Sequence, residues 1–130
     1  MNKIRTLVAH NDETVKNEII DSIKDLAFVE IVGTANCGIE TYNKIIDLKP
    51  EMVFAEYNFS SMNGLEIIKK SKETLNDDIP VFNMIVDEID DNELKEAVEM
   101  VGDKLNALVR KPYKERAINI MNDYNEYMYY

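Results

Sequence analysis

Residues 50–64, PEMVFAEYNFSSMNG, are the stretch that decides the fold of this chain. Met52 to Ala55 form an apolar run that ends in one carboxylate, Glu56, and a loop then leads to Gly64, where a helical pattern begins. A strand that is apolar along its whole length is typical of a parallel sheet covered on both faces. The stretch therefore predicts a central parallel strand with an acidic side chain at its carboxyl end.

Strand-like and helix-like periods alternate along the rest of the chain. Apolar runs predict strands at residues 3–9, 28–34, 52–56, 81–86 and 106–110. Helical patterns lie at residues 15–26, 39–49, 64–75, 90–103 and 114–127. Five β–α units in succession imply right-handed crossovers and a doubly wound sheet. We therefore expect an α/β fold in which helices cover both faces of a five-stranded parallel sheet.

Length and composition fit one soluble domain. The chain has 130 residues, which predicts a single domain at 1–127 and a C-terminal tail at 128–130. A net charge of −10 argues against a nucleic-acid surface, which needs clustered cations. One cysteine, Cys37, permits no intramolecular disulfide and no thiolate metal cluster. No apolar run reaches the roughly 20 residues of a membrane span, and MNKIRT lacks a secretory core, so we expect a cytoplasmic protein with no membrane partner.

Polar residues gather where ligands bind in such sheets, at the carboxyl ends of the strands. The residues predicted at those ends are His10, Asn11, Asp12, Glu56, Ile85 and Lys111. His10, Asn11 and Asp12 also supply capping groups for the first helix. The sequence therefore predicts one site, assembled from segments that are far apart along the chain.

Four segments, in this order and spacing, resemble the receiver domain of two-component response regulators. They are IRTLVAHNDE, LKPEMVFAEYNFSSMNGLEII, DIPVFNMIV and LVRKPY. The resemblance implies a flavodoxin-like α/β fold, a (βα)5 three-layer sandwich with a five-stranded parallel sheet in the order 2-1-3-4-5. The resemblance implies that Glu56 takes the place of the phosphoacceptor Asp and that Lys111 is the retained lysine, preceding a cis proline. It places the acidic, Mg²⁺-holding pair on His10 and Asn11, or on Asn11 and Asp12 if the register slips by one.

The two switch positions of the family also differ here. The resemblance places the Thr or Ser position on Ile85 and the aromatic position on Leu108, so neither can follow a phosphoryl group as the family's residues do. Phosphoryl transfer needs a metal that bridges carboxylate and phosphate. Glu56 advances its carboxylate by about 1.5 Å relative to Asp, and a shift of that size can cost roughly a hundredfold in rate. We therefore expect a degenerate pseudo-receiver.

Several alternatives remain open from sequence. Glu56 could mimic a phosphorylated Asp by reaching Lys111, or form an ordinary surface ion pair with it. His10, Asp12 and Glu56 could hold a transition metal, although we expect no metal centre and at most weak Mg²⁺ binding. A small flavin carrier shares the strand order, but the acidic segment after the first strand would repel a phosphate. The tail YNEYMYY could be a partner-binding patch or a frayed helix end.

The function predicted from sequence is a receiver-like signalling module of two-component systems that is not an enzyme and acts by protein–protein interaction without phosphorylation. The alternative is a phosphoaccepting receiver of a phosphorelay with an atypical Glu56 and Asp12 pocket. Expected partners are a histidine kinase, a downstream effector, or a second copy bound through the face of residues 90–124. No effector domain lies within these residues, so the chain is either free-standing or the front of a longer regulator.

Overall fold

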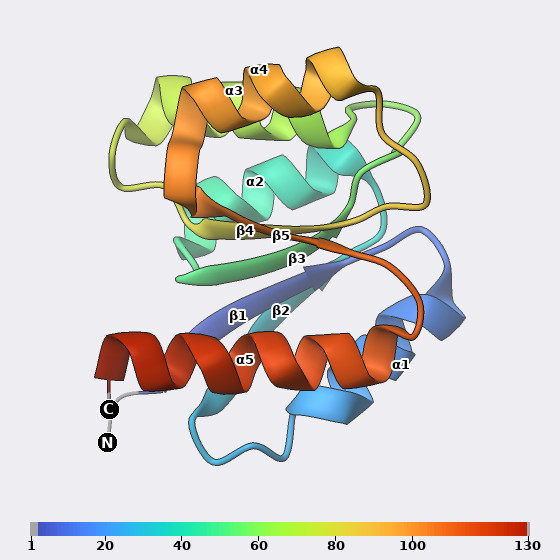
Figure 1. The fold of residues 1–130 in the computed structure, drawn as a ribbon, viewed down its shortest axis with the longest axis vertical. Coiled ribbons are helices and arrows are strands. Elements are labelled where there is room, and N and C mark those ends of the chain that lie inside the picture. Colours follow the sequence, from blue (N-terminus) through green and yellow to red (C-terminus); the bar gives the residue numbers. More distant parts are fainter. Residues whose placement is uncertain (1–2, 130) are drawn as a thin grey trace.

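The computed structural model describes residues 3–129 as one parallel sheet with helices on both faces (Figure 1). The strands are β1 (Ile4–Ala9), β2 (Val29–Ala35), β3 (Met52–Glu56), β4 (Val81–Ile85) and β5 (Leu105–Val109). They lie in the order β2-β1-β3-β4-β5, and every neighbouring pair is parallel. The predicted flavodoxin-like α/β fold and its strand order are therefore confirmed.

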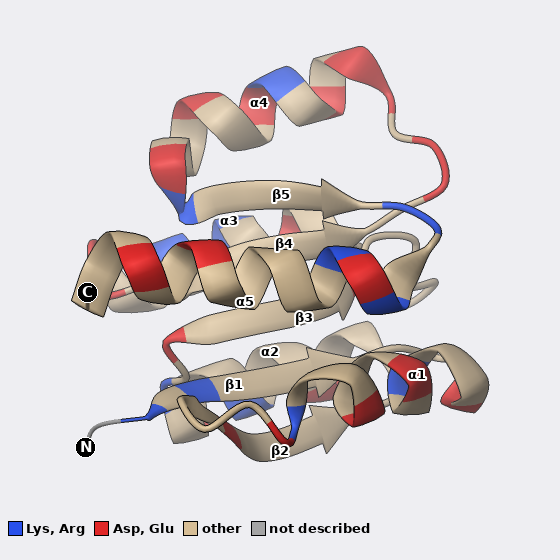
Figure 2. Ribbon diagram, turned by 60° about the horizontal axis from the view of Figure 1, so that its bottom comes forward, with Lys and Arg blue, Asp and Glu red and all other residues tan. Residues whose placement is uncertain are grey.

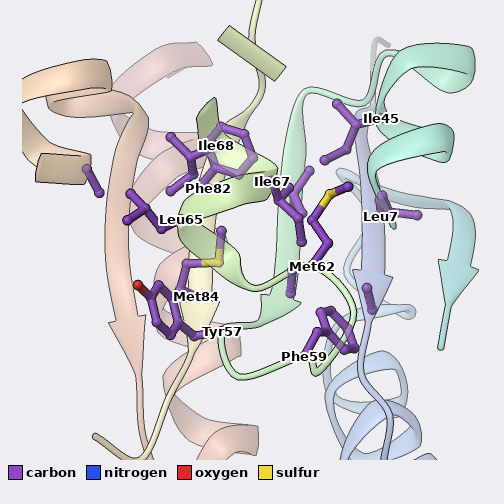
Figure 3. Packing of buried hydrophobic residues seen from close by; sticks show 14 of the residues in the cluster. Leu7, Ile45, Tyr57, Phe59, Met62, Leu65, Ile67, Ile68, Phe82 and Met84 are labelled. Carbon is purple, nitrogen blue, oxygen red and sulfur yellow. The ribbon is translucent and has the colours of Figure 1, made fainter. Parts of the chain in front are cut away.

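The helices divide unequally between the two faces. On one face lie α2 (Gly38–Leu48), α3 (Gly64–Leu75) and α4 (Asp91–Val101), and on the other lie α1 (Glu13–Ile23) and α5 (Tyr113–Tyr129). The sheet thus separates two apolar clusters, one under each layer of helices. Figure 3 shows part of the cluster beneath α2, α3 and α4, in which Phe82 and Ile68 pack closely. Because β3 contributes to both clusters, its residues Met52 to Ala55 are fully buried, as the apolar run predicted.

Local capping explains where the helices begin. Asp12, Asn63 and Asp90 each accept a hydrogen bond from a backbone N–H in the first turn of α1, α3 and α4, respectively. Such a bond satisfies one of the donors that a helix start leaves unpaired. Gly102 ends α4 with a positive φ of 54°, and a short 3-10 helix, η1 (Gly102–Lys104), follows before β5. The capping role that the sequence predicted for Asp12 is confirmed, and α4 ends at Val101, two residues before the predicted bound of 103.

The C-terminal helix is longer than the sequence pattern indicated. It was expected from about 114 to 127, whereas α5 extends through Tyr129. The hydroxyl groups of Tyr124 and Tyr129 both donate to Glu51 Oε2, in the former case over 2.7 Å. These bonds tie the last turns of α5 to the segment that leads into β3, so the described part of the tail is helical rather than frayed. The expected tail residue 130 lies outside the described residues.

A bulge interrupts the pairing of β5 with β4. Phe82 pairs with Leu105 and Asn83 with Ala107, so Asn106 is the extra residue on β5. Its side-chain amide donates to Asn83 Oδ1 over 2.9 Å, and the fully buried Asn83 amide in turn donates to the Val53 carbonyl over 3.2 Å. Between β4 and Lys111 the chain is therefore irregular at two places, η1 and this bulge.

No helix within residues 3–129 combines the length and the apolar character that a membrane crossing requires.

Candidate functional site

A polar cavity of about 260 Å³ lies at the carboxyl ends of β1, β3 and β4. It brings together five of the residues that the sequence placed at this edge, namely His10, Asp12, Glu56, Ile85 and Lys111. The other lining residues are Val15, Asn58, Val86, Asp87 and Tyr113. Asn11 and Leu108 do not line the cavity. The polar lining residues come from four separate segments, at the ends of β1, β3, β4 and β5, as expected for a site at strand ends.

The Glu56 carboxylate points towards the segment that follows β1. Its Oε1 accepts a hydrogen bond from the Asn11 backbone N–H over 2.9 Å and lies 3.6 Å from His10 Nδ1. The side chain is 19% exposed, so much of it is shielded from bulk water. Glu56 therefore links the end of β3 to the loop after β1 through a hydrogen bond that it accepts.

His10 is held by its own loop. Its Nδ1 accepts the Asp12 backbone N–H over 2.9 Å. A ring nitrogen that accepts a hydrogen bond carries no proton, so in this arrangement the ring proton lies on Nε2. The 3.6 Å approach of Nδ1 to Glu56 is thus not a hydrogen bond in this geometry.

The Asp12 carboxylate is engaged at the start of α1. Its Oδ1 accepts from the backbone N–H groups of Thr14 over 2.8 Å and of Val15 over 3.4 Å. The residue is exposed, and it lines the cavity beside Glu56. Asp12 therefore combines a capping role with a negative charge at the edge of the site.

Lys111 lines the cavity but does not pair with Glu56. Among the ion pairs within residues 3–129, none involves Lys111, so the contact that both sequence readings of Glu56 required is not formed. The reason lies in the direction of the Glu56 side chain, which takes the Asn11 N–H on the β1 side. The Lys111–Pro112 peptide bond is cis, as the resemblance implied.

The two switch positions are apolar and packed. Ile85 is 3% exposed and belongs to the cluster under α1 and α5, while Leu108 is half-buried and packs against the opposite cluster. The Ile85 carbonyl accepts the Tyr57 N–H over 2.9 Å. Neither side chain carries a group that could bind a phosphoryl oxygen.

Among the lining residues that were not singled out from sequence, Asp87 and Tyr113 carry ionisable side chains. Asp87, which follows β4, is exposed and adds a third carboxylate to the cavity. Tyr113 is buried, and its pKa is raised above the ordinary value first by burial and then by Asp87 and the other nearby acids. Tyr113 belongs to the LVRKPY motif, so the sequence could have placed it at the site. Asp87 belongs to an exposed acidic run, and nothing in the sequence distinguishes it from its acidic neighbours.

The transition-metal alternative finds no support in the geometry. Within residues 3–129 no three His, Cys, Asp or Glu side chains are grouped so that they could hold a metal ion. In this arrangement His10 Nδ1 and one Asp12 oxygen each accept a hydrogen bond from a backbone N–H group.

Relatives of known type share this fold and, more weakly, the sequence. No protein-family model matches the chain. It is 27% identical over 123 residues to a protein-glutamate methylesterase/protein-glutamine glutaminase of Clostridium acetobutylicum, a match that covers 95% of this chain and 35% of that protein. The chain thus spans about a third of the length of this curated relative.

Solved receiver domains superimpose on nearly the whole chain. The signal receiver domain of the putative response regulator NarL of Mycobacterium tuberculosis has a TM-score of 0.80 at 13% identity, with 97% of this chain and 98% of that chain covered. The response regulator domain of Thermotoga maritima CheB has a TM-score of 0.78 at 20% identity, with 96% of each chain covered. The chain therefore has the fold of these receiver domains, and over most of its length its sequence is similar to that of the curated relative.

Proposed function

We propose that this domain is a pseudo-receiver, a signalling module that binds a protein partner without being phosphorylated and that has no catalytic activity of its own. The observation that carries the proposal is the orientation of the Glu56 side chain. Its carboxylate is turned towards β1 and accepts the Asn11 N–H, and the switch position beside it is the buried Ile85. A carboxylate in this position supports the strand ends instead of presenting a nucleophile to the cavity.

The charges around the cavity also favour this proposal. A receiver that takes a phosphoryl group needs Mg²⁺ bound to several hard oxygen ligands. Here the carboxylates that line the cavity are Asp12, Glu56 and Asp87, and Asp12 and Glu56 each already accept backbone hydrogen bonds. An imidazole and an amide occupy the positions that the resemblance assigns to the acidic pair. Without a metal, the carboxylates would repel an incoming phosphate.

Incubation with acetyl phosphate and Mg²⁺, followed by intact-mass measurement, tests the proposal. The wild-type protein is expected to gain no phosphate-sized adduct. The matched control is a variant with the family's residues restored, His10→Asp, Asn11→Asp, Glu56→Asp and Ile85→Thr, which is expected to gain one. An adduct on the wild type that is absent from Glu56→Gln would refute the proposal and favour the alternative, a phosphoaccepting domain that uses Glu56 and Asp12.

The partner-binding surface that we propose is the face of residues 90–124. Figure 2 shows acidic residues along α4 and the loop before it, and basic residues in the loop after β5 and the first turn of α5. An acidic patch beside a basic one is self-complementary under two-fold symmetry. A homodimer through this face is one form of the proposal, and a histidine kinase or a downstream effector is the other.

Sedimentation at low salt separates the two forms. If the homodimer exists, the wild type sediments as a dimer, and the double charge reversal Lys114→Glu with Arg116→Glu sediments as a monomer. Added salt should weaken the dimer, since exposed charges are screened beyond about 8 Å at physiological ionic strength. Monomeric profiles for both proteins would end the homodimer form and leave a heterologous partner.

A further inference from the structure

Tyr57 connects the candidate site to α4. It directly follows Glu56, its side chain is 3% exposed, and its hydroxyl donates to Glu93 Oε1 over 2.8 Å. Glu93 lies in the first turn of α4. Figure 3 shows the Tyr57 ring beside Met84 in the cluster beneath the helices. One buried side chain therefore spans from the carboxyl end of β3 to the helix at the edge of the proposed partner surface.

Hydrogen bonds hold the Tyr57 backbone on both sides, and close packing holds its ring. Its N–H donates to the Ile85 carbonyl over 2.9 Å, and its own carbonyl accepts the Gly64 N–H over 2.7 Å. A Cβ on Gly64 would lie 2.4 Å from Tyr57 Cδ2, so the ring packs against the start of α3 at a distance that only glycine permits. A displacement of the end of β3 therefore moves the ring and its hydroxyl together.

The hydrogen bond from Tyr57 to Glu93 has a carboxylate as its acceptor, which makes it a charge-assisted bond. An ionised acceptor makes a hydrogen bond shorter and stronger than a neutral one does. Burial first, and then the hydrogen bond to Glu93, raise the pKa of Tyr57, so its hydroxyl remains a donor into alkaline pH. A separate ion pair, from Lys69 to Glu96 over 2.7 Å, joins α3 to α4, but its partners are exposed, and exposed pairs contribute little.

We infer that Tyr57 is a positioning residue that couples the Glu56 end of β3 to α4. It would do so in place of the hydroxyl and aromatic switch whose positions hold Ile85 and Leu108. This inference goes beyond the proposed function, because the coupling operates whatever occupies the cavity. A phosphate adduct on Glu56 would end the proposed function and leave the Tyr57 coupling intact.

Amide hydrogen exchange of the peptides that cover α4 tests whether the Tyr57 hydroxyl stabilises this helix. Tyr57→Phe removes only the hydroxyl and is expected to speed exchange in the first turns of α4 about tenfold, the typical effect of losing a hydrogen bond to a charged group. Tyr42→Phe is the matched control, since it removes an exposed tyrosine hydroxyl that bonds to Thr74 between α2 and α3. Its α4 exchange should equal that of the wild type.

A second comparison tests whether a change at the site reaches α4 through Tyr57. Glu56→Ala removes the acceptor of the Asn11 N–H and is expected to alter α4 exchange in the wild-type background. In the Tyr57→Phe background the same substitution should leave α4 exchange unchanged, which a purely structural role would not predict. Equal effects of Glu56→Ala in both backgrounds, or α4 exchange in Tyr57→Phe equal to that in Tyr42→Phe, would overturn the inference.

Glu93 provides the reciprocal test. Glu93→Gln retains an oxygen acceptor and should speed α4 exchange less than Glu93→Ala does. The double variant Tyr57→Phe with Glu93→Ala should exchange no faster than either single variant, because both remove the same bond. Additive rates would show that the two side chains act independently, which contradicts the coupling.

Discussion

Gly38 offers a sharp test of the packing that supports the site. It is the first residue of α2 and is buried against the loop between β3 and α3. A Cβ built at Gly38 would lie 1.9 Å from the Met62 backbone oxygen and 2.8 Å from both its carbonyl carbon and its Cβ. The Cβ of Gly38→Ala would have to move about 1.1 Å simply to reach 3.0 Å from that oxygen, the shortest separation that real Cβ atoms show.

The obstacle to that movement is backbone, which cannot rotate away. Met62 is 9% exposed and its loop is anchored by Phe59, which is 5% exposed in the same cluster. Overpacking of this kind typically costs about 1–3 kcal/mol, and we expect the upper end here because neither side of the contact is flexible. For a domain of this length, that loss corresponds to a decrease in the melting temperature of about 10 °C.

Gly33→Ala is the matched control for thermal and urea unfolding. Its Cβ would meet the Leu48 Cδ1 methyl group at 3.0 Å, the end of a side chain that can rotate away. We expect this variant to lie within about 1 kcal/mol of the wild type. Helix propensity alone predicts the opposite sign at Gly38, since Ala favours a helix by up to about 1 kcal/mol over Gly. A Gly38→Ala protein as stable as the Gly33→Ala protein would refute the packing reasoning.

Three further outcomes are expected. Lys16→Met should change the free energy of unfolding by less than about 1 kcal/mol. The methionine side chain fills the buried space of the lysine side chain, and the partner Glu13 is exposed to water. A loss of several kcal/mol by urea titration would show that the ammonium group itself is required. The pKa of Tyr129 is raised to about 12 by its hydrogen bond to Glu51 and by burial, so the stability that this bond provides is present below pH 10 and is lost as the pH rises through 12. Over this range the urea midpoint of Tyr129→Phe should fall less steeply with pH than that of the wild type. Identical slopes for the two proteins would count against the bond. Calorimetric titration should find Mg²⁺ binding no tighter than millimolar, roughly 4 kcal/mol, whereas micromolar affinity would indicate that Asp12 acts as a ligand.

The architecture could be predicted from sequence because the determining signals are local and repeated. The bounds of β3 and α3 agree with the apolar run and with the glycine-started helix pattern. Strand ends elsewhere differ by about one residue, because the apolar pattern does not show where pairing stops. The assembly of His10, Asp12, Glu56 and Lys111 at one cavity followed from the rule that parallel strands end at the same edge.

The features that sequence missed depend on side-chain direction. Lys16 lies on the inner side of α1 and is 4% exposed, where its ammonium contacts Glu13 and Asn36, although its charge predicts an outer position. The orientation of Glu56 towards Asn11, and not towards Lys111, is likewise a choice between two nearby donors. Spacing along the chain carries no information about such choices. The Tyr57 contact with Glu93 joins residues 36 positions apart and has no sequence pattern.

The amide pair of Asn83 and Asn106 constrains how this sequence can diverge. The buried Asn83 oxygen is satisfied by the extra residue of the β5 bulge, so loss of Asn106 would leave a buried polar atom without that donor. Loss of the bulge would shift the register of β5 and turn its inward side chains outward. Substitution at one of these positions should thus be tolerated only with a compensating change at the other. Among relatives of this chain, positions 83 and 106 should vary together, both amides where the bulge is kept and both apolar where β5 is regular.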